Sequence, residues 1–277
     1  MNREEFFKAN RKNWDERVAI HRRDETGFYA VEQVLKGGDK LNAIEAQEIG
    51  DISGKRVAHL QCHFGLDSLC LAARGATVVG LDFSPSAIAE ARRLASVLER
   101  EAIFVEGNVY EARQLLDGLF DIVYVTWGAI NWLPDLKHWA QQVASLLKEG
   151  GYLYLAESHP AILCFEWIDG RIVPHYDWRT PADRPAANDL PFTYNGASER
   201  LQNTRTYEWI HPLSDIIGAL REAQLTIDWY HEHAALTWPL FPNMIKSEDG
   251  LYRLPIGFPQ LPLAFSLKAV KPGWREG

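Results

Sequence analysis

Strand-like and helix-like patterns of apolar residues alternate through the middle of the chain. Helical spacing relates Ile88, Ala91, Leu94, Ala95 and Leu98, and an apolar stripe of the same kind runs from Leu136 to Leu147. Short apolar runs typical of buried strands occur at Arg56–Gln61, Thr77–Leu81, Phe120–Val125, Tyr152–Glu157, Leu225–His231 and Phe265–Val270. This alternation predicts an α/β fold with a doubly wound, mainly parallel sheet that helices cover on both faces.

The stretch from Val57 to Asp82 carries the strongest indication of a ligand. A predicted strand runs into a turn that contains Gly65, a short helix follows, and the next strand ends at the carboxylate of Asp82. Ser84 can cap the helix after it, with Pro85 at the first helical position. A turn next to a helix N-terminus, with an acid at the adjacent strand end, suits a ligand that carries an adenosine.

The turn differs from the glycine-rich fingerprint that binds dinucleotides. That fingerprint has three glycines, which let a pyrophosphate approach the backbone. Here Gly65 is the only glycine of the turn, and Gln61 and His63 occupy the other two positions. Their side chains would crowd a pyrophosphate, so a ligand without phosphates fits better.

Five motifs in order resemble those of the class I S-adenosylmethionine-dependent methyltransferases. They are His59–Gly65, Val79–Ser84, Val105–Val109, Phe120–Val125 and Leu147–Leu153, within a region from about Ile52 to Pro160. The first motif of the family is acidic-x-Gly-x-Gly-x-Gly, and the chain departs from it at His59, Gln61 and His63. The last motif is similar to the Leu-Lys-Pro-Gly-Gly signature of the family, with Glu149 in place of proline.

The resemblance implies a Rossmann-like, seven-stranded sheet whose last strands form an antiparallel edge. It also implies S-adenosylmethionine as cofactor, S-adenosylhomocysteine as product, and in-line transfer of a methyl group to a small organic acceptor. The cofactor-binding residues that it indicates are Gln61, His63, Gly65, Asp82, Phe83, Asn108, Val109, Thr126 and Trp127.

Each of these positions has an expected role. Asp82 would bind the ribose, Asn108 and Val109 would frame the adenine, and Thr126–Trp127 would lie where cofactor and acceptor meet. Gly65 is expected to let backbone approach the ligand. His63 has two interpretations, because its ring could donate to the methionine carboxylate of the cofactor or cap the following helix.

Glu157 and His159 are the candidate catalytic residues. Both follow the fifth strand, at the edge of the sheet where ligands of such folds bind. A base is needed only if the acceptor must lose a proton, and His159 suits that role because the ordinary pKa of imidazole lies near neutrality. The alternative for His159 is a turn histidine before Pro160. His211 is a second candidate that more readily starts a helix.

We expect one methyltransferase domain over residues 1–277. Its parts would be an N-terminal cap (1–50), the cofactor-binding core (51–160), a lid insertion (161–205), and a C-terminal part of the core (206–271) with a second insertion (235–262). Both insertions are rich in proline and aromatic residues. Such long segments are more typical of ordered covers than of structureless loops. Their aromatic residues would wall a pocket for a small organic substrate or form the core of the insertions themselves.

Composition narrows the setting of the protein. The net charge of −8 and the pI near 5.6 argue against a nucleic-acid surface. Three cysteines form no paired framework, so we expect a cytoplasmic protein, and no apolar run is long enough to predict a membrane span. The histidines show no zinc-type spacing, so no metal is expected. Cys62 is expected to serve packing, and the sequence indicates no oligomeric state.

Two other functions remain open at this point. A nicotinamide-dependent oxidoreductase would use the same doubly wound sheet, although the missing glycines disfavour it. A non-catalytic member that binds a partner or only senses the cofactor is suggested by the altered first motif.

Overall fold

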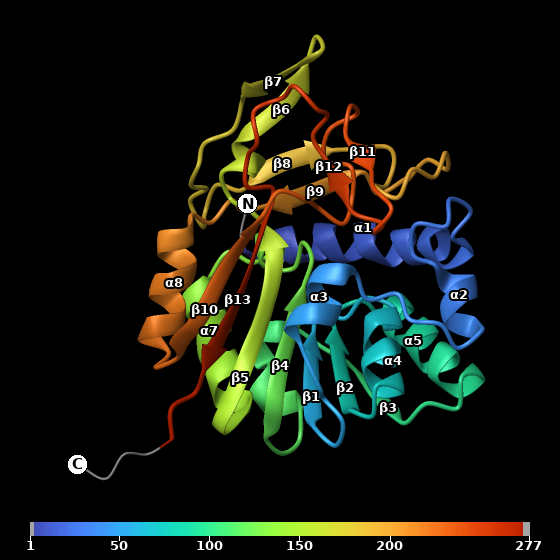
Figure 1. Cartoon of the computed structure of the whole chain (residues 1–277), viewed down its shortest axis with the longest axis vertical. Coiled ribbons are helices and arrows are strands. Elements are labelled where there is room, and N and C mark those ends of the chain that lie inside the picture. The colour runs from blue at the N-terminus through green and yellow to red at the C-terminus, as the bar shows by residue number, and fades with distance from the viewer. Residues whose placement is uncertain (1–2, 274–277) are drawn as a thin grey trace.

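The computed structural model describes residues 3–273 of the chain, and seven of the strands in this range form one sheet. Their order is β10-β13-β5-β4-β1-β2-β3 (Figure 1). The strands are β1 (Arg56–Leu60), β2 (Thr77–Asp82), β3 (Ala102–Glu106), β4 (Phe120–Thr126), β5 (Leu147–Ser158), β10 (Thr226–His233) and β13 (Ala264–Val270). The predicted doubly wound, mainly parallel seven-stranded sheet is confirmed.

The antiparallel edge differs in detail from the expectation. β13 runs antiparallel to both of its neighbours, β5 and β10. β10 therefore points the same way as β5, and only the inserted strand β13 is reversed. In this order the last strand, β13, inserts between β5 and β10, which both precede it in the sequence.

Helices cover both faces of the sheet (Figure 1). They are α4 (Leu66–Ala73), α5 (Pro85–Val97), α6 (Ala112–Leu115), α7 (Leu136–Leu146) and α8 (Leu213–Glu222). Consecutive residues of β1 enter different clusters of the core: Ala58 packs with residues of α7 and α8, whereas Val57 packs on the opposite face with Leu71 of α4. This alternation places apolar side chains on both faces of one strand, as a doubly covered sheet requires.

Local signals in the sequence account for where the helices begin. The Ser84 hydroxyl accepts a hydrogen bond from the Ala87 N–H at 3.1 Å, and Pro85 takes the first helical position of α5, as predicted. Asp135 caps α7 in the same way, accepting from the His138 N–H at 3.1 Å. Capping fixes the direction in which each helix leaves the carboxyl end of its strand.

A cover of helices and hairpins lies over the carboxyl ends of the parallel strands (Figure 1). Its helices are α1 (Arg3–Arg23), α2 (Val31–Leu35) and α3 (Ala43–Glu48). Its hairpin strands are β6 (Phe165–Ile168), β7 (Arg171–Pro174), β8 (Ala186–Asp189), β9 (Arg205–Glu208), β11 (Ile245–Lys246) and β12 (Tyr252–Arg253). Short 3-10 turns complete the connections at η1 (Val109–Glu111), η2 (Ile130–Trp132) and η3 (Ile162–Cys164). β9 begins at Arg205, so the β8–β9 hairpin crosses the expected boundary at 205/206.

α1 is held against β9 by side chains that bond to backbone. The Asn10 side chain both donates to the Tyr207 carbonyl and accepts from the Tyr207 N–H, each at 2.8 Å. The Glu16 carboxylate accepts from the N–H groups of Gln202 and Asn203. Two segments almost two hundred residues apart in sequence therefore form one layer of the cover.

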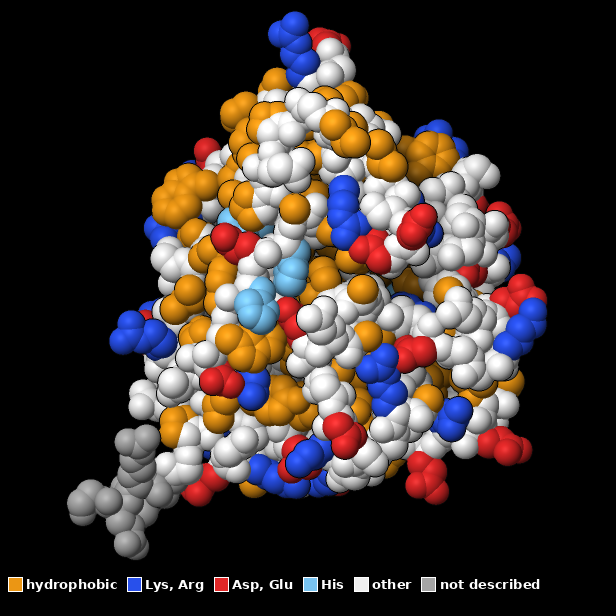
Figure 2. Space-filling model, in the orientation of Figure 1, with side chains coloured by type: hydrophobic (Ala, Val, Ile, Leu, Met, Phe, Trp, Pro, Cys, Tyr) orange, Lys and Arg blue, Asp and Glu red, His pale blue; other side chains and the backbone are white. Residues whose placement is uncertain are grey.

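The surface carries mixed charge. On the face in Figure 2, acidic and basic side chains are interspersed rather than gathered into a stripe of one sign. Among residues 3–273, no helix combines the length and the apolar character that crossing a bilayer demands.

Candidate functional site

A cavity of about 830 Å³ lies where β1, β2 and β4 end, beneath the cover. Eight of the nine residues predicted to bind the cofactor line it, namely Gln61, His63, Asp82, Phe83, Asn108, Val109, Thr126 and Trp127. They come from four separate stretches of sequence that the parallel sheet brings to one edge. The ninth, Gly65, does not line the cavity.

The turn after β1 has a glycine-like backbone at all three positions of the family motif. The φ angles are 57° at Gln61, 50° at His63 and 80° at Gly65. A non-glycine residue in this left-handed region costs roughly 1–2 kcal/mol. The chain therefore keeps the backbone shape of a glycine-rich turn while placing two side chains there.

Those two side chains connect the turn to its surroundings. Gln61 Nε2 donates to the Ala129 carbonyl at 2.7 Å, on the loop after β4. His63 Nε2 lies 2.9 Å from His21 Nδ1, on α1 of the cover. Neither earlier interpretation of His63 describes this contact, because the ring faces the cover and Gly65 is the cap residue of α4. His63 thus joins the turn to the cover.

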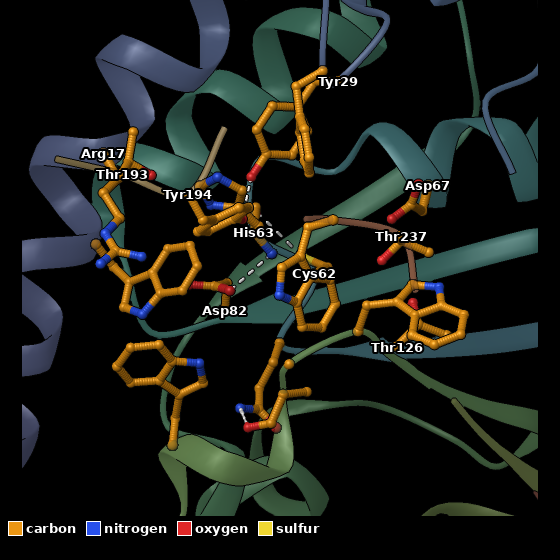
Figure 3. Close-up of a pocket in the computed structure, with 18 of the residues that line it drawn as sticks. Arg17, Tyr29, Cys62, His63, Asp67, Asp82, Thr126, Thr193, Tyr194 and Thr237 are labelled. Atoms are coloured by element: carbon orange, nitrogen blue, oxygen red, sulfur yellow. Dashed lines mark hydrogen bonds between the residues drawn. The ribbon is translucent and has the colours of Figure 1, made fainter. Parts of the chain in front are cut away.

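His21 is the centre of a buried polar cluster. Its Nε2 lies 2.6 Å from the Thr193 hydroxyl, and its Nδ1 lies 3.0 Å from the Tyr29 hydroxyl. The Tyr29 hydroxyl also contacts the Tyr194 hydroxyl (Figure 3). Burial lowers the pKa of His63 to about 3 and lowers the pKa of His21 well below its usual range. Both imidazoles are therefore neutral at pH 7, so one ring can donate to the other.

Gly65 is required by packing rather than by ligand approach. A Cβ atom at this position would lie 2.7 Å from the Phe104 ring and 2.9 Å from the Ala91 side chain. The glycine therefore allows α4 to begin in close contact with β3 and α5. The expectation that its backbone meets the ligand is replaced by this role.

Asp82 is buried at the end of β2. One of its carboxylate oxygens accepts from the His63 N–H at 2.8 Å (Figure 3). The other accepts from the Ser84 N–H at 2.9 Å. Burial raises the pKa of Asp82 to about 6, and these hydrogen bonds oppose the rise. Each oxygen keeps a lone pair that ribose hydroxyls can use.

The remaining wall offers polar atoms that lack a partner among the described residues. Five are buried: Arg17 Nε, Gln61 Oε1, Thr126 Oγ1, Trp127 Nε1 and Asn131 Oδ1. Asn108 also lines the cavity, and its Oδ1 accepts from the Tyr110 N–H at 3.0 Å. Buried polar atoms are normally satisfied, so these groups fit a polar ligand. The ammonium and adenine of S-adenosylmethionine carry matching donors and acceptors.

Glu157 is engaged by the loop after β4. Its carboxylate accepts from the N–H groups of Gly128, Ala129 and Ile130 at 2.5 to 2.8 Å. Burial raises its pKa to about 7. Glu157 does not line the large cavity, so its geometry is that of a loop anchor and lends no support to a catalytic role.

His159 also lies outside the wall of the large cavity. Its Nδ1 accepts from the Ala161 N–H at 3.2 Å, and its Nε2 lies 3.2 Å from a carboxylate oxygen of Glu232 on β10. Burial lowers its pKa. The ring thus sits in a turn, as the alternative interpretation expected. His211 likewise binds a backbone carbonyl, that of Leu133, at 2.7 Å.

The other reactive side chains show no sign of activation. His231 and His233 face the same side of β10 and approach Glu48, and no group of three metal-ligating residues occurs between residues 3 and 273. Burial raises the pKa of the Cys62 thiol well above its usual range. A protonated, buried thiol is a poor nucleophile, which agrees with a packing role.

Several charged residues of the cavity wall were not predicted: Arg17, Lys40, Asp67 and Glu208. A signal for Arg17 was present in the sequence. The buried face of α1 contains Asn10, Asn13, Arg17 and His21 at helical spacing. Polar residues where an apolar stripe is expected indicate a helix that faces a polar site. Lys40 and Asp67 form an ion pair at 2.6 Å that no local pattern predicts.

Comparison with known proteins agrees with this geometry. Residues 58–153 match the sequence profile of a methyltransferase domain. A ubiquinone biosynthesis O-methyltransferase of Escherichia coli is 27% identical over 162 residues, which cover 56% of this chain and 66% of that protein. The chain spans less than two thirds of the length of the first curated relatives that it matches: 66% of one and 45% of another.

Solved structures show the same fold. An S-adenosylmethionine-dependent methyltransferase from Mesorhizobium loti superposes with a TM-score of 0.57 at 18% identity, covering 79% of this chain and 92% of that one. A glycopeptide N-methyltransferase complexed with S-adenosylmethionine gives a TM-score of 0.52 at 16% identity, covering 82% and 90%. The chain thus has the fold of S-adenosylmethionine-dependent methyltransferases, and its residues 58–153 match a methyltransferase domain.

Proposed function

We propose that the protein transfers the methyl group of S-adenosylmethionine to a small organic acceptor. The observation that carries the proposal is the meeting of eight expected cofactor-binding residues around one covered cavity of about 830 Å³. That volume falls in the range of small-molecule sites, roughly 300–1,000 Å³.

The contribution of the protein would be alignment and exclusion of water. The bound cofactor supplies an activated methyl group, and holding the acceptor in line with it provides much of the rate. α1 and the segment around Tyr194 lie over the turn after β1 and are fixed to it through His21 and His63. Asp82 and the unpartnered Thr126 hydroxyl line the same cavity and would hold the cofactor there.

An oxygen atom is the acceptor that we favour. The Escherichia coli relative is named an O-methyltransferase, and aromatic side chains such as Trp14, Trp132 and Tyr194 line the cavity. Transfer to a hydroxyl would call for a base if the proton leaves early. Glu157 and His159 were predicted for that role, but their placement away from the cavity does not support it.

Two experiments test the proposal against its alternatives. Calorimetric titration with S-adenosylhomocysteine, NAD and NADP should show binding of the first alone. A screen of metabolite extracts with methyl-labelled S-adenosylmethionine should then yield a labelled product. Binding of NAD would favour an oxidoreductase. Cofactor binding without turnover on any extract would favour a non-catalytic member of the fold.

The setting follows from composition. The three cysteines in the described residues are all free and form no disulfide. The net charge of −8 disfavours nucleic acid as a partner. We therefore place the protein in the cytoplasm with a small-molecule acceptor.

A further inference from the structure

Arg17 is a buried cation at the wall of the large cavity. It projects from α1, and only 5% of the residue is exposed to solvent. The guanidinium carbon lies 5.0 Å from the centre of the Trp14 ring and 5.7 Å from that of the Tyr194 ring. Figure 3 shows Arg17 and Tyr194 on the same side of the cavity as Asp82. The two rings hold the guanidinium in place without neutralising it.

The guanidinium has no carboxylate partner among residues 3–273. None lies within 4 Å, and Arg17 Nε is buried without a hydrogen bond. Glu208 is the carboxylate that acts on Arg17 electrostatically, but its two oxygens accept from the side-chain amides of Asn131 and Asn188. Lys40, another cation of the wall, has Asp67 at 2.6 Å. Arg17 therefore differs from Lys40 in having no carboxylate in direct contact with it.

A buried charge without a partner is energetically unfavourable, and in proteins it is normally paired or hydrogen-bonded. The aromatic contacts of Arg17 compensate only part of its lost hydration. A planar guanidinium with free N–H groups is also the side chain best suited to bind a carboxylate through two parallel hydrogen bonds. We propose that Arg17 binds a carboxylate group of a ligand in the large cavity.

The inference rests on the proposed function, because that function supplies the ligands. Two of them could present the carboxylate. One is the methyl acceptor, which would then be an organic acid whose apolar part contacts Trp14 and Tyr194. The other is the methionine end of the cofactor. In both cases the guanidinium of Arg17 would bind a carboxylate, and two binding experiments distinguish the acceptor from the cofactor as its source.

The first experiment concerns the cofactor. Calorimetry would measure the affinities of S-adenosylhomocysteine and 5′-methylthioadenosine, which lacks the carboxylate, for wild type, Arg17→Gln and Lys12→Gln. Lys12 is an exposed cation of the same helix and serves as the matched control. If the cofactor is the source, Arg17→Gln should lose at least tenfold in affinity for S-adenosylhomocysteine and none for methylthioadenosine. Failure of wild type to bind either nucleoside would instead contradict the proposed function.

The second experiment concerns the acceptor. Benzoate and its neutral analogue benzamide would be titrated into protein saturated with S-adenosylhomocysteine. If the acceptor is the source, wild type and Lys12→Gln should prefer benzoate, and Arg17→Gln should lose that preference at least tenfold. The proposal is overturned if Arg17→Gln changes neither the S-adenosylhomocysteine affinity nor the benzoate preference.

Stability of the ligand-free protein separates ligand binding from a structural role. Arg17→Met keeps an apolar stem between the two rings and removes the unpartnered charge. We expect its thermal unfolding temperature to equal or exceed that of wild type, with both proteins free of ligand. A lower unfolding temperature would mean that the charge stabilises the fold, and the proposal would then be wrong.

Discussion

Single residues in the turn after β1 show how a sequence can depart from a motif and keep its shape. Gln61 and His63 hold the left-handed backbone that glycine would adopt without strain. Their side chains are used in contacts with the β4 loop and with α1. The strain at these positions is therefore offset by bonds that a glycine could not make.

Asp82→Ala should weaken binding of S-adenosylhomocysteine by about 1.5–3 kcal/mol, the scale of hydrogen bonds lost from a charged group. Glu106→Ala is the control, because Glu106 faces Asp82 in the strand register but does not line the cavity. Calorimetry measures both, and thermal unfolding checks that Asp82→Ala is folded. Unchanged affinity in a folded Asp82→Ala would remove Asp82 from the site.

The same residue predicts a pH dependence. The pKa of Asp82 is raised to about 6, and ribose hydroxyls donate best to its ionised form. Below pH 6 the carboxyl group must release a proton when the nucleoside binds. The affinity of wild type should therefore fall as the pH drops from 7 to 5, whereas the affinity of Asp82→Ala should not. Parallel curves for the two proteins would contradict the assignment.

His63→Gly should fold, because glycine accepts a φ of 50°. The free energy of unfolding of His63→Gly should depend less on pH than that of wild type. The pKa of His63 is about 3 in the folded protein and about 6.5 when unfolded, so below pH 6.5 the unfolded state binds the extra proton. This residue therefore destabilises wild type by about 2 kcal/mol on going from pH 7 to 5.

Urea unfolding of both proteins at the two pH values measures this effect. The stability of wild type relative to His63→Gly should drop by that amount in acid. A difference that does not change with pH would mean that the pKa of His63 is the same in the folded and unfolded states, and is not lowered by burial. Failure of the variant to fold at pH 7 would make His63 a structural requirement.

At the scale of elements, α4 depends on the absence of one side chain. Gly65→Ala should lower the free energy of unfolding by about 1–3 kcal/mol more than Gly50→Ala, because the new methyl group would overlap the Phe104 ring. Gly50 is the matched control: its φ is also positive, at 64°, but nothing lies within 4 Å of an added Cβ. Urea unfolding at pH 7 measures both variants. Equal losses of stability would mean that the cost at Gly65 comes from backbone strain alone and not from contact with the Phe104 ring.

The elements of the core could be predicted because their patterns are local. Alternation of apolar runs, the Ser84–Pro85 start of α5 and the strand end at Asp82 are all written in short stretches of sequence. The roles of Glu157 and His159 could not be predicted from local sequence patterns. A strand end points to the right edge of the sheet, but only the fold reveals that the Glu157 carboxylate is taken up by three backbone N–H groups.

At the scale of the whole molecule, the cover joins parts of the chain that no local pattern relates. Arg17 escaped prediction because its partners Trp14 and Tyr194 lie on different segments, and because the absence of a counter-charge is visible only in three dimensions. The ion pair of Lys40 and Asp67 joins distant positions in the same way. Long-range pairing of this kind shapes the covered side of the cavity.

The cover should be the least protected part of the described protein. We expect the backbone amides of residues 161–203 and of α1 to exchange hydrogen faster than those of β1. Many residues of 161–203 are exposed. α1 is attached to β9 and the residues before it by hydrogen bonds from side chains, and not by a ladder of backbone bonds as in the sheet. Exchange mass spectrometry should show slowing with S-adenosylhomocysteine, and more with acceptor present. Uniform protection in all states would indicate a rigid insertion and an open groove, which would favour a larger acceptor.

The pairing of α1 with β9 also bears on how the chain is made. A ribosome adds roughly 5–20 residues per second, so α1 exists for roughly 10–40 seconds before residues 202–208 are synthesised. During that interval its inner face is bare. Asn10, Asn13 and Arg17 on this face can be hydrated by water, whereas leucines there would invite aggregation. These polar groups, of which Asn10 and Arg17 later line the cavity, would thus keep the nascent helix soluble until its partner segment emerges.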